Sequence, residues 1–365
     1  MGAEQEYGEY NAWLQPWRHT AGHSFRLDAS AGVSAVVKEE CIAGMERLFG
    51  SDIWQADAQA VVSLAINKSL PNEGYRLTHR KNVLLVEGAD VNGILYGVFG
   101  LLREFGIGKR PQEIATESAP AVSRRVINHW DRIDGGVERG YAGNSIFFKD
   151  NRLSFDPARI RDYARLLASV GINVVAINNV NVSQSSAELI TAGMLPKVAE
   201  LADIFRLYGI RIAISVHFES PVMLGGLSTS DPLDERVIAW WKAQTDELYR
   251  IIPNFSGYLV KADSEFRGGP ASVGRTQADG ANMLARAVAP HGGVVYWRSF
   301  IYNCTQDWRD TQTDRPKAAY DLFKPQDGLF DSNVILQVKN GPSDFQVREP
   351  NSPLFGVMKQ TREAL

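Results

Sequence analysis

Three charged residues at the end of a short apolar stretch are the residues in this sequence best suited to chemistry. Tyr258–Val260 is typical of a buried strand. Lys261, Asp263 and Glu265 follow it at alternate positions, so at the two-residue period of a strand their side chains would share one face. Two carboxylates and an ammonium group gathered at an apolar strand end are costly unless they bind or react with something. The alternative is a solvated loop, and the neighbouring elements favour the site.

The elements that must position these residues form a repeated pattern after Arg125. Short apolar runs alternate with amphipathic helices, which is typical of a parallel sheet. The predicted strands are Val126–Trp130, Ile172–Ile177, Ile210–Val216, Tyr258–Val260, Gly293–Trp297 and Val334–Val338. The predicted helices are Pro157–Val170, Met194–Tyr208, Asp234–Ile252 and Gln277–Ala289. A (β/α) barrel of the TIM type fits better than an open sheet, because no Gly-rich phosphate turn follows the first strand.

Each predicted strand ends in polar or charged residues. In chain order these are His129-Trp130-Asp131, Asn178-Asn179, His217-Phe218-Glu219, Lys261 to Glu265, Arg298, and Lys339-Asn340 with Asp344. Any one group alone is well explained as a helix cap or a satisfied polar residue. A barrel brings all of its strand ends to one mouth, where TIM-barrel enzymes place their chemistry. The full series therefore predicts a catalytic or binding mouth.

Two carboxylates at this mouth indicate what reaction it could perform. Glu265 and Asp344 follow different strands and could lie on opposite sides of a bound ligand. One protonated and one ionised carboxyl group flanking a glycosidic bond is the usual arrangement for glycoside hydrolysis. Trp130 could stack on a sugar face. These residues favour a glycosidase.

Three cations aimed at the same cavity indicate an anionic substrate. Lys261, Arg298 and Lys339 would not be needed for a neutral sugar, whereas a carboxylate can be bound bidentately by arginine. The alternative is that these cations only pair with acidic neighbours in the protein. The acidic residues available for that are Asp263, Asp344 and Glu219.

Other kinds of chemistry find less support. His129 and His217 have no local partner at metal-ligand spacing, and Cys41 and Cys304 are too few and too distant for a disulfide framework or a metal cluster. A Gly-x-Ser-x-Gly nucleophile motif and a P-loop are both absent from the sequence. We therefore expect neither a metal nor another cofactor.

Charge and hydropathy exclude further classes of partner. The net charge is −3 without basic runs, which gives no support for binding nucleic acid or an anionic membrane. No apolar run approaches the roughly 18 residues of a membrane span. The first residues show neither the basic region nor the apolar core of a secretory signal, so the expected location is cytoplasmic.

We expect two domains. Residues 1–120 are predicted to form a small α/β domain, and residues 121–365 the catalytic barrel domain. Within the first, the predicted elements are a strand at Val61–Ile66, a hairpin of Gly74–His79 and Asn82–Glu87, a helix at Val91–Phe105 capped by Asp90, and a linker at Pro111–Val122.

Several longer motifs, spread over nearly the whole chain, carry a family resemblance. They are Asn128-His-Trp-Asp131, Glu138-Arg-Gly-Tyr-Ala-Gly143, Asn178-Asn-Val-Asn181, His217-Phe-Glu-Ser-Pro221, Gly226-Leu-Ser-Thr-Ser-Asp-Pro-Leu233, Lys261-Ala-Asp-Ser-Glu265, Lys339-Asn-Gly-Pro342 and Asp344-Phe-Gln-Val-Arg-Glu-Pro350. Together they closely resemble the microbial α-glucuronidases of glycoside hydrolase family 67. The resemblance implies removal of α-1,2-linked glucuronic acid, or its 4-O-methyl ether, from xylooligosaccharides, with inversion and without a metal.

Roles for individual residues follow from this resemblance. Glu265 matches the general acid, and Asp344 matches one of two carboxylates that activate water. An inverting mechanism then expects these two carboxyl groups about 6.5–9.5 Å apart. The residues matched to substrate binding are Lys261, Arg298 and Lys339 at the uronic carboxylate, Trp130 in the sugar pocket, and Val180 near the 4-O-methyl group. Asp263 and Asn179 are further substrate-binding candidates.

Two features depart from the family pattern. Phe266-Arg267 follows Glu265 where the family typically has Gly-Gln. Family members also continue well past the point matched by Leu365, with further barrel strands, the second base-side carboxylate, and a helical domain that supports dimerisation. Lys359–Leu365 is not predicted to be the seventh strand, so we expect a truncated barrel of about six of the eight strands.

This expectation leaves three hypotheses open. The chain is an α-glucuronidase in which Asp344 suffices as base, a fragment that binds uronic acids without turnover, or a half-enzyme that needs a C-terminal partner chain. The expected partner is an aldouronic acid or other xylooligosaccharide, and a homodimer or a missing C-terminal segment also stays open.

Overall fold

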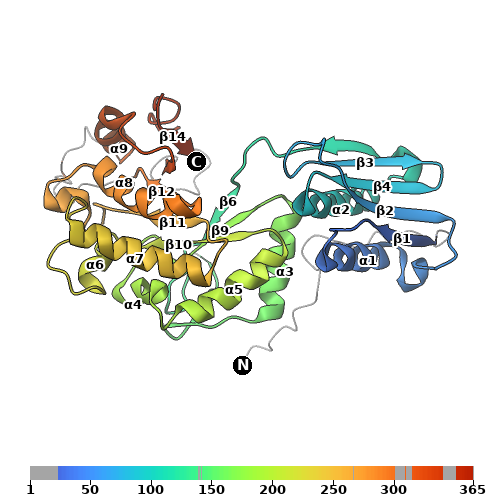
Figure 1. Ribbon diagram of the computed structural model, residues 1–365, viewed down its shortest axis with the longest axis horizontal. Coiled ribbons are helices and arrows are strands. Elements are labelled where there is room, and N and C mark those ends of the chain that lie inside the picture. The colour runs from blue at the N-terminus through green and yellow to red at the C-terminus, as the bar shows by residue number, and fades with distance from the viewer. Residues whose placement is uncertain are drawn as a thin grey trace. The chain divides into compact units, whose positions relative to one another are not determined.

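The chain forms two compact units. The structure is a computed structural model (Figure 1) and describes residues 24–138, 140, 142–265, 267–300, 309, 315–339 and 351–364. The first unit takes in the described residues up to Ile127, together with Asp156–Val174 and Asp203–Ile210. The second unit holds Asn128–Phe155, Val175–Ala202 and the described residues from Arg211 onward.

A five-stranded mixed sheet organises the first unit. In spatial order its strands are β1 (Phe25–Ala29), β2 (Ala60–Ile66), β4 (Val83–Gly88), β3 (Tyr75–Arg80) and β5 (Ala115–Ser118). β1, β2 and β4 run parallel, whereas β3 is antiparallel to both β4 and β5. The predicted strand at Val61–Ile66 and the predicted hairpin are confirmed.

Two helices, α1 (Ala35–Phe49) and α2 (Val91–Gly106), accompany this sheet. Asp90 Oδ1 accepts the amide of Gly93 at 2.8 Å, as an N-cap does. The apolar residues of α2 that repeat at helical spacing are buried, as expected for a helix that packs on β3 and β4. Gly97 permits this close packing, since a Cβ there would lie 2.8 Å from Cγ1 of Val86. The predicted helix and its cap are confirmed.

The segment predicted as a linker is in part a strand. β5 pairs antiparallel with β3 and forms one edge of the first sheet. Its sequence, Ala-Thr-Glu-Ser, is largely exposed and has no apolar alternation. The linker prediction over Pro111–Val122 is therefore wrong at these positions, because an exposed edge strand lacks the pattern that marks a half-buried one.

A curled parallel half-barrel sheet of seven strands has most of its residues in the second unit. Its strands lie in space in their order along the chain: β6 (Val126–Asn128), β9 (Val174–Ile177), β10 (Arg211–Val216), β11 (Gly257–Val260), β12 (Val294–Arg298), β13 (Val334–Gln337) and β14 (Arg362–Ala364). From β10 to β14 each neighbouring pair is parallel. β9, β11 and β12 are buried along their whole length. All six predicted strands are confirmed.

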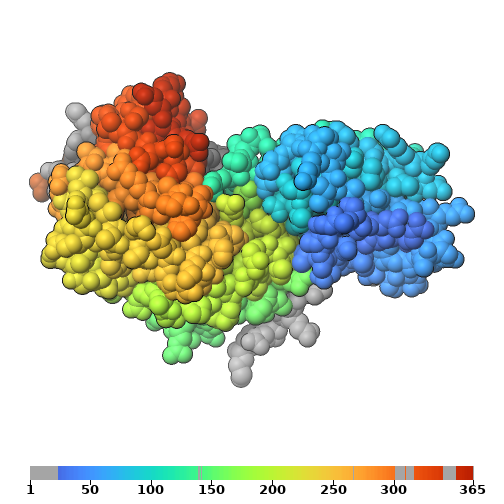
Figure 2. Space-filling view, in the orientation of Figure 1, coloured from blue at the N-terminus to red at the C-terminus, as the bar shows by residue number. Residues whose placement is uncertain are grey.

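Helices separate these strands in the sequence, as predicted. They include α3 (Pro157–Ser169), α5 (Leu195–Leu207), α7 (Glu235–Ile251), α8 (Gln277–Val288) and α9 (Arg315–Phe323). Asp234 caps α7, and Thr276 with Asp279 forms a capping box on α8. α7 and α8 pack against each other, and their residues adjoin in yellow and orange on the face that Figure 2 shows. α8 also packs on β12. The four predicted helices are confirmed.

The seventh strand corrects an expectation from the sequence. Arg362–Ala364 pairs parallel with β13, with Leu336 opposite Glu363. The prediction that Lys359–Leu365 contains no such strand is wrong. These three residues, Arg-Glu-Ala, have no apolar signature and are defined as a strand by their backbone pairing alone.

Candidate active site

The segment after β11 brings Lys261 and Glu265 together. The strand ends at Val260, and the chain then turns with positive φ at Asp263 (49°) and Glu265 (51°). Lys261 Nζ donates to Glu265 Oε2 and, at 2.8 Å, to Asn181 Oδ1. Lys261 is buried, whereas the Glu265 side chain is 26% exposed. Positive φ in residues other than glycine is uncommon and often marks functional sites.

Electrostatic crowding surrounds the Lys261 ammonium group. Burial lowers the pKa of Lys261, and the hydrogen bond and negative charge of Glu265 oppose this shift. The positive charges of Arg298 and Arg267 lower it further. A carboxylate ligand beside Lys261 would offset this repulsion, because an opposite charge within a few ångströms favours the charged form.

Asp263 takes a structural position away from this pair. Its Oδ2 accepts the Ala271 amide at 3.0 Å and Nε2 of Gln277 at 2.5 Å, which holds the following turn against the start of α8. Burial raises the pKa of Asp263, and these hydrogen bonds oppose the rise. The prediction that the three charged residues share one face is wrong, because β11 ends before them and the positive φ values redirect the chain.

The other two predicted cations follow the next two strands. Arg298 is the last residue of β12 and is buried, and its positive charge lowers the pKa of Lys261. Lys339 follows β13, and its Nζ lies 3.9 Å from the ring centroid of Phe300, a cation–π contact. Lys261 is thus held at Glu265, and Arg298 and Lys339 lie at or just after the ends of the next two strands.

The ends of β6 and β9 are joined through Asn179. Its Nδ2 donates to the carbonyl of Trp130 at 2.8 Å and to Oε2 of Glu138 at 2.6 Å, and its Oδ1 accepts the amide of Asn181 at 2.7 Å. Asn179 and the adjacent Val180 are both buried. Asn179 therefore positions the backbone of Trp130. It also binds Glu138, which was not predicted as part of the site.

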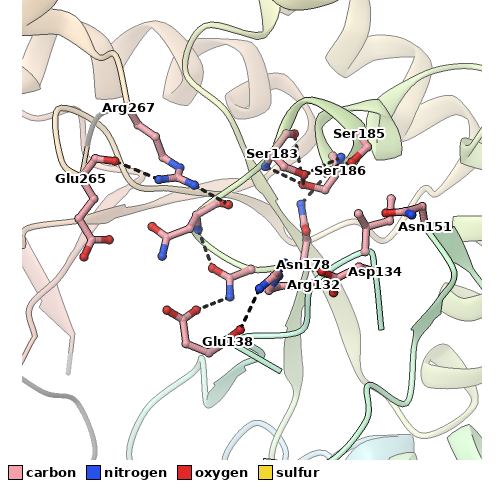
Figure 3. A pocket seen from close by; sticks show the side chains of 13 residues that line it. Arg132, Asp134, Glu138, Asn151, Asn178, Ser183, Ser185, Ser186, Glu265 and Arg267 are labelled. Carbon is pink, nitrogen blue, oxygen red and sulfur yellow. Dashed lines mark hydrogen bonds and ion pairs between the residues drawn. The ribbon is translucent and has the colours of Figure 1, made fainter. Parts of the chain in front are cut away.

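A polar pocket of about 620 Å³ lies between the segments that follow β6, β9 and β11 (Figure 3). Asparagine and serine side chains form much of its wall, and its charged residues are Arg132, Asp134, Glu138, Glu265 and Arg267. Of the predicted site residues, Glu265 and Asn179 line it. Amide and hydroxyl groups both donate and accept hydrogen bonds, so this wall suits a ligand with many hydroxyl groups, such as a sugar.

His217, at the end of β10, is held neutral. Burial lowers the pKa of His217 to about 4, and the charge of Arg267 contributes. Its Nδ1 accepts the amide of Glu219 at 3.1 Å, so the proton of the neutral ring is on Nε2. This imidazole is therefore a hydrogen-bond donor at neutral pH.

A second histidine, His129, has a different environment. Its Nδ1 lies 3.0 Å from Oδ1 of Asp131, and Ser145 Oγ donates to the other carboxylate oxygen. Burial opposes ionisation of Asp131, but the hydrogen bond and charge of His129 outweigh it and lower the pKa of Asp131. Asp131 thus ties the residue after β6 to a later part of its own loop.

Asp344, the predicted base, lies outside the described residues. Its separation from Glu265 stays a prediction. Its assignment rests on the sequence motif alone, as does the expected spacing of the two carboxyl groups.

Three residues at the site were not among those predicted. Arg267 donates from Nη1 to the Glu265 carbonyl at 3.1 Å and from Nη2 to the Asn181 carbonyl at 3.0 Å. Asn181 binds Lys261, and Glu138 binds Asn179. Asn181 and Arg267 come shortly after β9 and β11, and that position is the signal by which they could have been found.

Other classes of site are not seen in the described part of the chain. Among those residues no three His, Cys, Asp or Glu side chains are grouped so that they could hold a metal ion. Within the same residues, no helix has both the length and the apolar character needed to cross a membrane.

Comparison with solved structures supports the fold. A β-N-acetylhexosaminidase from Bacteroides fragilis matches with a TM-score of 0.53 at 12% identity, covering 88% of this chain and 66% of that one. A family GH115 4-O-methyl-α-glucuronidase with specificity for decorated arabinogalactans matches with a TM-score of 0.52 at 11% identity, covering 88% and 47%. At these identities the likeness concerns the fold alone.

Sequence comparison gives much closer relatives. The chain is 46% identical over 321 residues to α-glucuronidase A of Emericella nidulans, which covers 85% of this chain and 37% of the relative. It is 48% identical over 293 residues to the probable α-glucuronidase A of Aspergillus fumigatus, covering 80% and 34%. The chain thus spans about a third of the length of these relatives. Residues 105–365 match the glycosyl hydrolase family 67 middle domain, and the chain belongs to glycoside hydrolase family 67.

Proposed function

We propose that this chain removes α-1,2-linked glucuronic acid, or its 4-O-methyl ether, from xylooligosaccharides by an inverting acid/base mechanism. The observation that carries the proposal is the buried ammonium group of Lys261, which holds the carboxylate of Glu265 and is acted on by the positive charge of the buried Arg298. Cations from neighbouring strand ends suit a substrate carboxylate. Membership of family 67, whose members matched here are named α-glucuronidases, supports the same activity.

The reaction divides between two carboxyl groups. Protonated Glu265 donates its proton to the xylose oxygen as the bond from that oxygen to C1 of the uronic acid breaks. Asp344, assigned by its motif, takes a proton from a water molecule whose oxygen forms the new bond to C1 from the opposite face. The products are free glucuronic acid with inverted configuration and the xylooligosaccharide.

Lys261 would link substrate binding to this proton transfer. Its ammonium group holds Glu265 Oε2, and a uronic carboxylate at Lys261 would compete for the same donor. A substrate carboxylate also adds negative charge beside Glu265, which favours its protonated form. Binding of the substrate would therefore prepare Glu265 to act as an acid.

The remaining predicted residues fit around this centre. We assign Lys339 and Arg298 to the uronic carboxylate, with Trp130 against the sugar ring and Val180 near the 4-O-methyl group. Asn179 acts by holding the backbone of Trp130, and Asp263 by holding the turn that follows Glu265. In this proposal the seven parallel strands are part of a (β/α) barrel of the TIM type, whose mouth carries the site.

An activity assay on a defined aldouronic acid tests the proposal. We expect release of glucuronic acid, detected by chromatography, with the inverted anomer identified by NMR before mutarotation. Glu265→Gln should abolish release while leaving the circular dichroism spectrum of the folded chain unchanged. A folded wild-type chain that gives no product at high concentration would contradict the proposal.

A second candidate function is uronic acid binding without turnover. It requires only the cations Lys261 and Arg298, both buried, and no base that activates water. Calorimetry would then show glucuronate binding that is lost in Arg298→Met, with no product formed. Addition of a separately produced C-terminal segment of a relative would distinguish a half-enzyme, in which turnover appears, from a binding protein, in which it does not.

A further inference from the structure

Arg267 joins the two loops that hold the acid and its partner lysine. Its amide donates to the Ser264 carbonyl at 3.2 Å, which closes a tight turn around Glu265. The guanidinium donates from Nη1 to the Glu265 carbonyl at 3.1 Å and from Nη2 to the Asn181 carbonyl at 3.0 Å. Figure 3 shows its side chain between these two segments at the wall of the pocket. Arg267 thus fixes the position of the residue that carries the acid.

These contacts close a ring of hydrogen bonds. From Arg267 the ring passes to Asn181, whose Oδ1 accepts Lys261 Nζ at 2.8 Å. Lys261 donates in turn to the Glu265 carboxylate, and the Glu265 carbonyl returns to Arg267. Because Glu265 has a φ of 51°, which a glutamate rarely adopts, its backbone needs such support.

The charge of Arg267 also acts on this cluster. Burial lowers the pKa of Arg267, and the negative charges of Glu265 and Glu138 oppose that shift. Its positive charge in turn lowers the pKa of Lys261 and of His217. A buried cation beside a carboxylate stabilises the ionised form of that carboxylate.

Charged groups from several elements face this cluster. They are Lys261 and Arg267 after β11, Arg298 at the end of β12, Glu138 after β6 and His217 after β10. His217 is neutral near pH 7, since its pKa is about 4. Near neutral pH, removing the charge of Arg267 therefore removes a cation that acts on the carboxylates of Glu265 and Glu138.

We propose that Arg267 is a positioning residue for the acid, holding Glu265 through its carbonyl and stabilising its ionised form through charge. The catalytic part of this inference rests on the proposed function. The effect of Arg267 on the ionisation of Glu265 does not depend on it. A role in folding alone would require only the two hydrogen bonds to carbonyl groups. The proposal requires that the charge of Arg267 also be felt at the Glu265 carboxylate.

A titration of Glu265 tests this charge effect without any need for turnover. The full chain is labelled with ¹³C at glutamate side-chain carboxyl groups, and Glu265→Gln identifies the Glu265 resonance by its disappearance. In Arg267→Gln, which keeps a donor but removes the charge, we expect the titration midpoint of Glu265 to rise by about one pH unit. In Arg267→Lys, which keeps the charge, the midpoint should stay within a few tenths of a unit of wild type.

Arg275→Gln is the matched control. Arg275 lies in the same loop, and its exposed side chain pairs with Asp231 at 2.9 Å, so its loss removes the same charge away from the site. An unmoved midpoint in Arg267→Gln, or an equal shift in Arg275→Gln, would overturn the proposal. If Arg267→Gln does not fold, Arg267→Lys and Arg267→Met are compared instead, and equal midpoints in these two would overturn it.

Turnover provides a second and separate readout. With an active wild type, we expect kcat for Arg267→Gln to fall about tenfold with little change in KM, and the alkaline limb of the pH profile to move to higher pH. Arg267→Lys should restore the wild-type profile. A wild type without turnover would contradict the proposed function, while the NMR titration would still decide the role of Arg267.

Discussion

Both units of the molecule contain buried charged side chains, but the surroundings of these side chains differ. In the first unit Glu40 accepts from Nε of Arg165 at 2.7 Å and from the hydroxyl of Tyr208 at 2.6 Å. All three residues are at most 5% exposed. In the second unit Lys261 and Glu265 also pair, but Glu265 is 26% exposed and lines a pocket.

Backbone geometry and neighbouring charges distinguish the candidate active site from a structural ion pair. Glu40 and Arg165 lie on helices of ordinary geometry, and their partners enclose them. Glu265 has a positive φ, and several cations crowd its partner Lys261. A position in a pocket wall, an unfavourable backbone conformation and repulsion between like charges together indicate a binding site, where a ligand of opposite charge would offset the repulsion.

The largest effect on stability is expected from the first unit. Arg165→Met removes the cation beside the buried Glu40 carboxylate and should lower the free energy of unfolding by about 3–5 kcal/mol. Urea denaturation monitored by circular dichroism would measure the change. Arg206→Met is the control, because Arg206 and Asp203 are exposed and their pair is expected to be worth no more than about 1 kcal/mol. Equal losses of unfolding free energy in the two variants would contradict the expected difference between buried and exposed pairs.

A pH-dependent effect of similar size is expected from His217. Its pKa is about 4 in the folded chain and near 6.5 when unfolded, so between these values the unfolded chain binds more protons. Stability should therefore be unaffected by this residue above about pH 6.5 and should fall as the pH drops toward 4, by on the order of 3 kcal/mol in all. His217→Gln should flatten that part of the stability curve. Identical curves for both chains would show that His217 titrates normally.

Much of the fold was predictable from the sequence because apolar strands and amphipathic helices leave clear periodic signals. The strands that were missed, Ala115–Ser118 and Arg362–Ala364, are short and polar, and only their pairing with a neighbour defines them. Pairing between segments distant in sequence leaves no local pattern. Edge strands are therefore where the sequence was least informative.

The site was predictable to a different degree. Residue type and position after a strand pointed to Lys261 and Glu265, which pair in the structure, and their roles at a site stay predictions. The same reasoning misplaced Asp263, because a positive φ at a residue other than glycine cannot be recognised from the sequence. Arg267 was noticed only as a departure from the family motif, and its contacts with two backbone carbonyls leave no trace in residue spacing.

A smaller effect on stability, with a large effect on binding, is expected at Lys261. Lys261→Met should change the free energy of unfolding by only about 1 kcal/mol, because the removed ammonium group was already disfavoured by burial and Glu265 remains partly hydrated. The same change should weaken glucuronate binding roughly tenfold to a hundredfold, the range expected for a charge-assisted hydrogen bond. Lys242→Met, at an exposed pair with Asp246, is the control for both measurements. A loss of stability as large as that of Arg165→Met would place Lys261 among the structural ion pairs.

The most direct test is a calorimetric titration of the full chain with D-glucuronate and, separately, with D-glucose. The two sugars differ at C6, where glucuronate has a carboxylate and glucose a hydroxymethyl group. If the strand ends of the second unit form a uronic acid site, glucuronate should bind at least tenfold more tightly, and Arg298→Met should remove most of that preference. Equal affinity for the two sugars, or a preference that Arg298→Met leaves intact, would contradict it.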